Sequence, residues 1–399
     1  MFVMKSKVYI AAAGSGKTTF IIDQTIDLHR KGLPANKKIL IVTFTTNNQN
    51  NIRSRIMSNF GYIPSNIVII GWFSFLLEYW IRPFKGTVLT QLYNRHVGLA
   101  HVDGISGMKK LKSGKFIMTY RNDTEKFLDK KQDNLYSDKL AEFAYKCWEN
   151  NKKDLEERFS NIVDTLFVDE VQDLAAWDYE LIKVLFKTNA VKCILCGDPR
   201  QHTYSTTKAP KNKKYEGNIV SYIANKVNNK KTTYVDIDVT TLSKSHRCGK
   251  DICSFASSLM PKHPATEMCS CSSCSEKRGK YTLQQGMFLV RKRDVKAYVE
   301  RYNPLTLVWN KTTKVIVDTG GIMNWGESKG LQAEATLIYL PNTLINYYSD
   351  SREEQPSKHV LSRFYVAVTR AMYTAALVVP DDFNNTFLNL PFWNDESSM

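Results

Sequence analysis

Residues 11–20, AAAGSGKTTF, combine small residues with a lysine and two threonines, the residue types that hold nucleotide phosphates. A short apolar run, KVYIA, precedes them, and TTFIIDQTIDLHRK follows with apolar side chains at helical spacing. In such a strand–turn–helix unit, backbone N–H groups and the helix N-terminus surround the phosphates, Lys17 reaches the β and γ oxygens, and the Thr18 hydroxyl binds Mg²⁺. A glycine-rich turn without a ligand is the alternative. The loop residues expected to contact a nucleotide are Ala13, Gly14, Ser15, Gly16, Lys17, Thr18 and Thr19.

Two adjacent acids end a second apolar run, TLFVDEVQDL, at residues 165–174. Asp169 is expected to hold the Mg²⁺ shell, and Glu170 to orient and deprotonate an attacking water. A pair of solvated carboxylates is the alternative, although the upstream phosphate loop favours the catalytic interpretation. A third run, CILCGDPRQHTYS, brings Gln201 to a position where it could sense the γ-phosphate, and an ordinary strand-to-loop turn is its alternative.

The overall charge of the chain concerns its partners rather than its fold. The 399 residues include 55 Lys and Arg against 39 Asp and Glu, a formal net charge of +16. Basic chains of this size most often bind nucleic acid, and the aromatic content of 12% favours single strands, whose binding sites combine basic grooves with stacking rings. A scatter of solvated lysines is the alternative.

The sequence contains no apolar run of membrane-spanning length, and MFVMKSK lacks the apolar core of a signal peptide. We therefore expect a cytoplasmic protein without a membrane partner, in which the eight cysteines stay reduced.

Strand-like apolar runs recur along the chain with helical patterns between them, which predicts an α/β fold with parallel sheets. The first domain is expected to comprise residues 1–85 and 162–240, and the second domain residues 241–399. Residues 86–161 are charged and mostly helical in pattern, and are expected to form a basic insertion that contacts nucleic acid or braces the first domain. A small Cys/Ser-rich insertion is expected near residues 262–280.

The order of these motifs resembles that of superfamily 1 DNA helicases of the UvrD/Rep type over nearly the whole chain. Besides the phosphate loop, TLFVDEVQDL is similar to motif II and LCGDPRQHTY to motif III. IVTFTTNNQNNIRSRI resembles motif Ia, IIGWFSFLL motif Ib, LSKSHRCGKDICSFAS motif IV and NWGESKGLQAEATLIYL motif V. RFYVAVTRAMYTAALVV resembles motif VI, the most specific of the set, and is interpreted as a buried strand followed by V-x-V-T-R-A.

The resemblance implies two RecA-like P-loop domains with ATP and Mg²⁺ in the cleft between them. Asp169 and Glu170 then keep the roles given above, and Gln201 couples the γ-phosphate to the DNA site. Arg247 and Arg370 are expected to be the second domain's arginines that face the γ-phosphate. In other nucleotidases one such guanidinium is worth about 10³–10⁵ in rate. A purely structural role is the alternative for both arginines.

The resemblance also implies a track for DNA. Aromatic residues of motifs Ia, Ib and III would stack on bases, worth about 1–3 kcal/mol per base, and a hydroxyl and a cation of motif V would contact phosphate. Aromatic residues at strand ends are at least as often part of a core. The expected nucleic-acid contacts are Thr43, Phe44, Trp72, Phe73, Tyr204, Ser328 and Lys329.

The chain departs from the family at several positions. His246 stands where a base-stacking aromatic precedes the motif IV arginine, and Thr19 stands where an arginine follows the loop, which leaves GTP open beside ATP. Gln332 aligns with the motif V glutamate and is expected to contact the nucleotide. Only about eighty residues separate Arg247 from Lys329, too few for the large auxiliary subdomain of UvrD and Rep. The chain is therefore similar to compact helicases of phages and of prokaryotic mobile or defence clusters, with DNA repair or phage defence as the expected setting.

The function that the resemblance implies is an ATP-dependent translocase on single-stranded DNA that moves 3′ to 5′ and unwinds partly duplex DNA. The alternative is an ATP-dependent DNA-binding switch that recruits or licenses a partner nuclease and unwinds little. A motor that tracks RNA is a third alternative, because motifs that follow a backbone do not select DNA. The oligomeric state stays open.

A cluster of cysteines occurs in HPATEMCSCSSCSEK, where Cys269, Cys271 and Cys274 lie within six residues. His263 comes just before them and Cys253 further back. Thiolates and one histidine could form a tetrahedral zinc site. The C-x-C spacing, without a second C-x-x-C pair, instead favours a flexible loop with reduced thiols. The sequence therefore assigns no metal beyond Mg²⁺.

Overall fold

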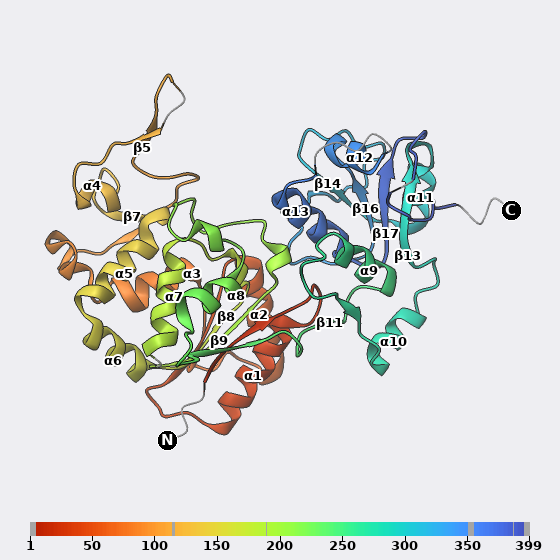
Figure 1. The fold of residues 1–399 in the computed structure, drawn as a ribbon. Helices are drawn as coiled ribbons and strands as arrows, with labels where there is room; N and C mark the ends of the chain where they lie inside the picture. Colours follow the sequence, from red (N-terminus) through yellow and green to blue (C-terminus); the bar gives the residue numbers. More distant parts are fainter. Residues whose placement is uncertain (1–4, 114–115, 189, 350–354, 386, 395–399) are drawn as a thin grey trace. The chain divides into compact units, whose positions relative to one another are not determined.

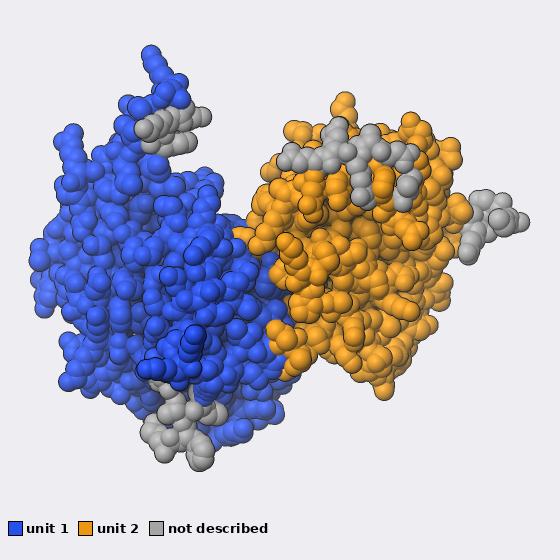
Figure 2. Space-filling view, viewed as in Figure 1, with its two compact units in different colours: residues 1–10, 17–199, 204–238 blue, residues 11–16, 200–203, 239–399 orange. Residues whose placement is uncertain are grey.

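The structure is a computed structural model that describes residues 5–113, 116–188, 190–349, 355–385 and 387–394. The chain divides into two compact units (Figure 2). Unit 1 comprises residues 1–10, 17–199 and 204–238, and unit 2 comprises residues 11–16, 200–203 and 239–399. The two short segments 11–16 and 200–203 therefore group with unit 2, although the residues on either side of them belong to unit 1.

Unit 1 is built on a six-stranded parallel sheet with the strand order β10-β1-β9-β8-β2-β3. The inner strands β2, β8 and β9 are almost wholly buried apolar runs, which is typical of a parallel sheet covered on both faces. The strands are β1 (Ser6–Ile10), β2 (Lys38–Thr43), β3 (Ile67–Gly71), β8 (Val163–Val168), β9 (Lys192–Gly197) and β10 (Val235–Asp238), and the longer helices outside residues 86–161 are α1 (Lys17–Lys31), α2 (Thr46–Phe60) and α7 (Trp177–Thr188).

Local sequence signals define where the α2 helix begins and ends. The Thr45 hydroxyl accepts a hydrogen bond from the Asn48 N–H at 3.2 Å, which satisfies one of the donors left open in the first turn. Gly61 follows the helix with φ of +77°, and its N–H donates to the Met57 carbonyl at 2.7 Å. A glycine is favoured at this position because side chains rarely adopt the left-handed conformation.

Unit 2 contains a five-stranded parallel sheet with the strand order β13-β17-β16-β14-β15. The prediction of an α/β fold with parallel sheets is therefore confirmed. Among the described residues, no helix is both long enough and apolar enough to cross a membrane. The strands are β13 (Gly286–Arg291), β14 (Leu305–Val308), β15 (Ile322–Asn324), β16 (Ala333–Tyr339) and β17 (Ala371–Val379), and the helices include α9 (Lys250–Ser258), α11 (Val295–Tyr302), α12 (Asn342–Tyr348) and α13 (Lys358–Val368).

Residues 86–161 contain both helices and short strands. The α5 helix (Leu140–Asn150) contributes Phe143, Ala144 and Cys147 to the hydrophobic core of unit 1, so this part of the segment braces the unit. The remainder includes two small strand pairs, one parallel and one antiparallel, and the antiparallel pair projects from the unit (Figure 1). The elements are β4 (Gly98–Ala100), β5 (Met108–Lys110), β6 (Phe116–Met118), α4 (Asp123–Phe127), β7 (Asn134–Tyr136) and α6 (Lys152–Ile162).

The residues before Val-Thr-Arg-Ala are helical, and the expectation of a buried strand there is wrong. They form α13, which begins after Ser357, whose hydroxyl accepts a hydrogen bond from the Val360 N–H. Phe364 to Val368 are all buried, so the apolar run has no exposed face to reveal its period. The pattern of a short, fully apolar run is equally compatible with a buried strand and with a buried helix. The strand of this motif, β17, begins only after Arg370.

Candidate functional site

The turn between β1 and α1 has the conformation that a phosphate loop requires. Gly14 and Gly16 have φ of +70° and +83°, where a residue with a side chain is strained. The Ser15 hydroxyl is buried, and it has no hydrogen-bond partner within the described part of the chain. Leaving such a group unsatisfied costs about 1–3 kcal/mol. A phosphate oxygen is an acceptor that would satisfy this hydroxyl, so the loop fits the anion that its sequence predicts.

Gly14 packs against the segment that carries the predicted motif IV. A Cβ atom built on Gly14 would lie 2.5 Å from the Arg247 Cβ and 2.8 Å from the Ser245 Oγ. The Gly14 carbonyl also accepts a hydrogen bond from the His246 N–H at 2.9 Å. All four residues belong to unit 2. Arg247 thus lies directly beside the phosphate loop.

The predicted Mg²⁺ ligands meet in unit 1. Thr18, in the first turn of α1, donates its hydroxyl hydrogen bond to the Asp169 Oδ2 at 3.0 Å. Asp169 is fully buried at the end of β8, and its N–H donates to the Val42 carbonyl at 2.9 Å. Burial, followed by the charge of Glu170, raises the pKa of Asp169 to about 6, while Lys17 and Thr18 act in the opposite direction. A hydroxyl and a carboxylate in contact are hard oxygen ligands of the kind that Mg²⁺ uses beside phosphates, so the pair fits this ion.

Glu170 is held in an unusual backbone conformation beside Asp169. Its φ and ψ are 58° and 41°, and its N–H donates to the Asp169 Oδ1 at 2.9 Å. The Gln172 side chain donates to the Glu170 Oε2 at 2.5 Å and accepts from the Asp198 N–H at 3.0 Å. Gln172 therefore fixes the carboxylate that is expected to act as the base. The motif pattern assigned no role to Gln172, although this residue lies inside the DEVQD stretch.

Gly197 leaves room for Gln172 at the end of β9. A Cβ atom on Gly197 would lie 2.6 Å from the Gln172 Oε1 and 2.6 Å from the Val171 Cγ1. Glycine at this position thus allows the amide to bridge the ends of β8 and β9, where polar groups of a parallel sheet gather.

Arg247 contacts two other predicted motifs of unit 2. Its Nε donates to the Gln332 Oε1 at 3.3 Å, and its Nη1 donates to the Thr369 carbonyl at 3.1 Å. Motifs IV, V and VI are thus joined by one guanidinium that is only half-buried. Gln332, predicted to bind the nucleotide, here bonds to this arginine.

Arg370 is buried and surrounded by acceptors. Its guanidinium donates to the Val366 carbonyl at 3.0 Å and to the Leu331 carbonyl at 3.1 Å. It also donates to the Ser328 carbonyl and to the Gln201 Oε1, each at 3.4 Å. In this conformation the guanidinium serves the structure of unit 2, and it joins the predicted motifs III, V and VI.

Arg200, the neighbour of Gln201, is a second buried arginine of unit 2. Its Nη1 donates to the Thr266 hydroxyl at 2.9 Å and to the Pro264 carbonyl at 3.0 Å, and its Nη2 donates to the Ala11 carbonyl at 3.2 Å. The guanidinium also lies 5.1 Å from the centre of the Tyr365 ring. No role for Arg200 was predicted from its position in the sequence. The structure shows that it anchors the start of the phosphate loop to the rest of unit 2.

Three of the predicted nucleic-acid contacts lie inside the protein. Trp72 is buried, and its indole N–H donates to the Asp178 Oδ1 at 2.8 Å, so the structure places it in the core of unit 1 rather than on a surface for bases. The buried Ser328 hydroxyl donates to the Trp325 carbonyl at 2.7 Å. Thr43 is also fully buried, at the end of β2. These side chains are needed for packing, which the motif pattern alone does not reveal.

The other predicted contacts remain accessible. Tyr204 is 55% exposed, and Phe44, Phe73 and Lys329 are half-buried. Phe44 lies over Trp72 with ring centres 6.0 Å apart, so that it extends the core towards the surface. Of these residues, Tyr204 is the one whose ring is free enough to receive a base.

Residues 2–207, just over half of the chain, match the sequence profile of the family AAA_19, described as an AAA domain. Two solved structures of arterivirus nonstructural protein 10, a helicase, are similar to the chain at 12% identity and a TM-score of 0.41. The similarity to the first structure covers 94% of this chain and 60% of the arterivirus chain. The similarity to the second structure, a complex with DNA, covers 96% of this chain and 63% of the arterivirus chain. The chain thus spans less than two thirds of the length of these two helicase chains. No curated protein matches it.

Proposed function

The chain belongs to the AAA_19 family of AAA domains, which is found in UvrD/Rep-like superfamily 1 helicases, and from this membership we propose that it is a nucleoside-triphosphate-dependent helicase. The specific activity that we propose is ATP-dependent movement along single-stranded DNA in the 3′ to 5′ direction, coupled to separation of partly duplex DNA. The observation that carries the proposal is the hydrogen bond of Thr18 to Asp169 directly after a glycine-rich loop with a buried, unsatisfied Ser15 hydroxyl.

The proposed chemistry begins with the phosphates on the loop. Backbone N–H groups, Ser15 and Lys17 bind the phosphate oxygens, and Thr18 and Asp169 would hold Mg²⁺. When bound, this ion would supply positive charge that offsets the charge of the transferring phosphate. Glu170, oriented by Gln172, accepts a proton from the attacking water.

The arginines of unit 2 couple hydrolysis to the rest of the protein in this proposal. Arg247 lies beside Gly14, so a small shift of its side chain away from Gln332 would bring it towards a phosphate on the loop. Arg370 would have to exchange its carbonyl acceptors for a phosphate, and Gln201, bonded to Arg370, would move with it. Such an exchange ties the state of the γ-phosphate to the packing of motifs III, V and VI, as a motor requires.

The nucleic-acid track is proposed on charge and on the accessible residues. The net charge of +16 favours a polyanion, and Tyr204 offers an exposed ring for stacking. Phe44, Phe73 and Lys329 complete the set of accessible predicted contacts.

ATP hydrolysis by the purified chain tests the proposal, with no nucleic acid, single-stranded DNA, duplex DNA or single-stranded RNA. We expect strong stimulation by single-stranded DNA, and we expect Lys17→Ala to abolish it. Lys5→Ala is the matched control, because Lys5 is an exposed lysine paired with Asp236 at 2.7 Å. Equal rates of ATP hydrolysis under all four conditions would show a nucleotidase that is not coupled to nucleic acid. Tight ATP-dependent DNA binding with slow turnover would instead favour the switch that licenses a partner nuclease.

A further inference from the structure

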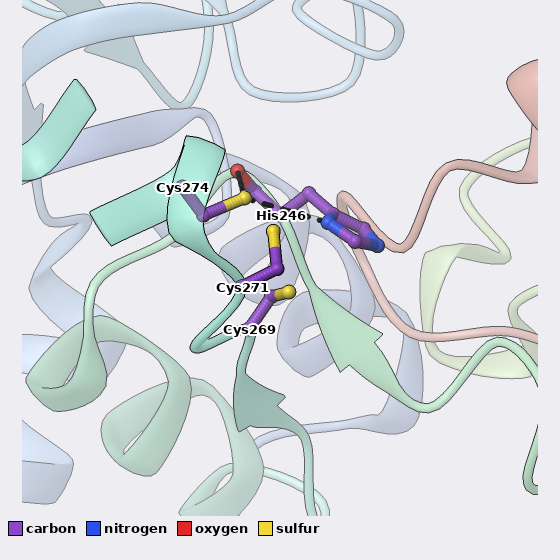
Figure 3. A group of neighbouring side chains, drawn as sticks. All are labelled: His246, Cys269, Cys271 and Cys274. Carbon is purple, nitrogen blue, oxygen red and sulfur yellow. Dashed lines mark hydrogen bonds between the residues drawn. The ribbon is translucent and has the colours of Figure 1, made fainter. Parts of the chain in front are cut away.

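Unit 2 brings one histidine and three cysteines together. His246, Cys269, Cys271 and Cys274 each offer one ligand atom, and these four atoms all lie within 4.8 Å of one another. Figure 3 shows the three sulfur atoms gathered on the side that the His246 ring nitrogen faces. The Cys274 Sγ lies 3.4 Å from the His246 Nδ1. The cluster combines one nitrogen and three sulfur donors, which come from residues as far apart in sequence as 246 and 274.

Strand register explains why His246 joins the cysteines. The short strands β11 (Lys244–Ser245) and β12 (Glu267–Met268) pair in parallel, with Ser245 opposite Met268. The next residue on each strand, His246 and Cys269, therefore emerge side by side. The Cys269 N–H donates to the Ser245 carbonyl at 2.8 Å and fixes this register.

The two remaining cysteines are delivered by the helix that follows. Cys271 is the residue before α10 (Ser272–Gly279), and Cys274 lies in its first turn. The Ser275 N–H donates to the Cys271 carbonyl at 2.9 Å, which folds the C-x-x-C stretch back on itself. Cys269 and Cys274 are buried, whereas His246 and Cys271 are exposed, so the cluster is open to solvent on one side. An ion therefore has a route into the site.

The distances suit a tetrahedral metal centre. Zinc–sulfur bonds of about 2.3 Å place the ligand atoms of a tetrahedron about 3.8 Å apart. Movements of about 1 Å or less would bring the four atoms from their present spacing to that geometry. Three thiolates and one imidazole, without an oxygen ligand, are a known structural zinc set, and soft sulfur ligands disfavour Mg²⁺ and Ca²⁺.

We propose that His246, Cys269, Cys271 and Cys274 form a structural zinc site. His246 binds through Nδ1, which leaves the proton on Nε2. The site differs from the group that the sequence suggested, because His263 and Cys253 have no place in it. The Cys253 thiol donates to the Cys248 carbonyl at 3.5 Å instead.

The zinc site supports the segment beside the phosphate loop. His246 donates its N–H to the Gly14 carbonyl, and the next residue, Arg247, packs on Gly14. A metal that holds the His246 side chain therefore fixes the backbone on which Arg247 is presented. Zinc here has no catalytic part. Its role is to join β11, β12 and α10 into one rigid support.

Zinc content of the full chain tests the site without reference to ATP hydrolysis, so the outcome is independent of the proposed function. The protein is purified under reducing conditions, incubated with Zn²⁺, desalted and analysed by atomic emission. We expect about one zinc per chain for the unmodified protein. Cys271→Ser and His246→Ala, both at exposed positions, should retain less than about a third of that amount, because loss of one ligand weakens binding steeply.

Matched controls come from the group that sequence spacing suggested. Cys253→Ser and His263→Ala should bind as much zinc as the unmodified protein. Cobalt in place of zinc should give the visible bands of a tetrahedral thiolate site, and Cys271→Ser should remove them. Equal zinc in all five proteins would overturn the proposal, as would a metal-free protein in which mass spectrometry finds a disulfide within residues 269–274.

Discussion

Replacing Gly14 with alanine tests the packing of the phosphate loop against the motif IV segment. The new methyl group would lie 2.5 Å from the Arg247 Cβ and 2.8 Å from the Ser245 Oγ, well inside ordinary contact. The Arg247 Cβ is bonded to the backbone and cannot rotate away, and the Ser245 Oγ can do so only by losing the hydrogen bond that it accepts from the Cys248 N–H at 3.0 Å. Gly14 also has φ of +70°, which strains any residue with a side chain.

The two effects of Gly14→Ala have separate magnitudes. The left-handed backbone costs about 1–2 kcal/mol for an L residue. Forcing a methyl group into filled space costs a further 1–3 kcal/mol or so. The free energy of unfolding should therefore fall by about 2–5 kcal/mol in the absence of nucleotide.

Gly61→Ala is the matched control because it isolates the backbone term. Gly61 has φ of +77°, and a Cβ atom there would have no heavy atom within 4 Å among the described residues that do not adjoin it in the chain. Its cost should be about 1–2 kcal/mol. Urea denaturation followed by circular dichroism measures both variants. Equal destabilisation by the two substitutions would refute the packing of Gly14 against Ser245 and Arg247.

Three further predictions concern single residues. Glu170→Gln should keep nucleotide affinity but slow single-turnover hydrolysis by about 10²–10⁴-fold, because an amide cannot accept the proton; unchanged hydrolysis would exclude Glu170 as the base. Burial raises the pKa of Asp178 to about 6 from 3.8, so the native state binds its proton more tightly than the unfolded state. Asp178 therefore stabilises the folded state below pH 4, and this contribution of about 3 kcal/mol is lost as the pH rises to about 6. The free energy of unfolding from urea titrations should fall over this pH range in the unmodified protein but not, through this group, in Asp178→Asn. Tyr204→Ala should weaken single-stranded DNA binding about 5- to 150-fold, as measured by fluorescence anisotropy, whereas Tyr62→Ala, which removes a ring that is 59% exposed, should not.

The apolar pattern of the sequence was enough to predict the sheets but not all of their strands. β2, β8, β9 and β16 follow from continuous apolar runs. β10 was missed because it contains two acids. Its place at the edge of the sheet is supported instead by pairing with β1, where Lys5 meets Asp236 at 2.7 Å and Lys7 meets Asp238 at 2.9 Å.

The motif order placed the residues of the candidate site in sequence, while their partners depend on tertiary contacts. Thr18 and Asp169 are 151 positions apart, and the motif pattern was sufficient to expect their meeting. The bonds of Arg370 to backbone carbonyls had no sequence signal, because any residue supplies a carbonyl. His246 joins the cysteines only through the pairing of two two-residue strands, which no spacing rule detects.

Directional movement along a strand tests the central proposal most directly. Single-stranded DNA carries biotin and streptavidin at one end or the other, and release of streptavidin is followed with ATP present. We expect ATP-dependent release from the 5′ end to be much faster than from the 3′ end, and Lys17→Ala to release neither. ATP hydrolysis with equal, spontaneous release from both ends would contradict a motor that moves 3′ to 5′.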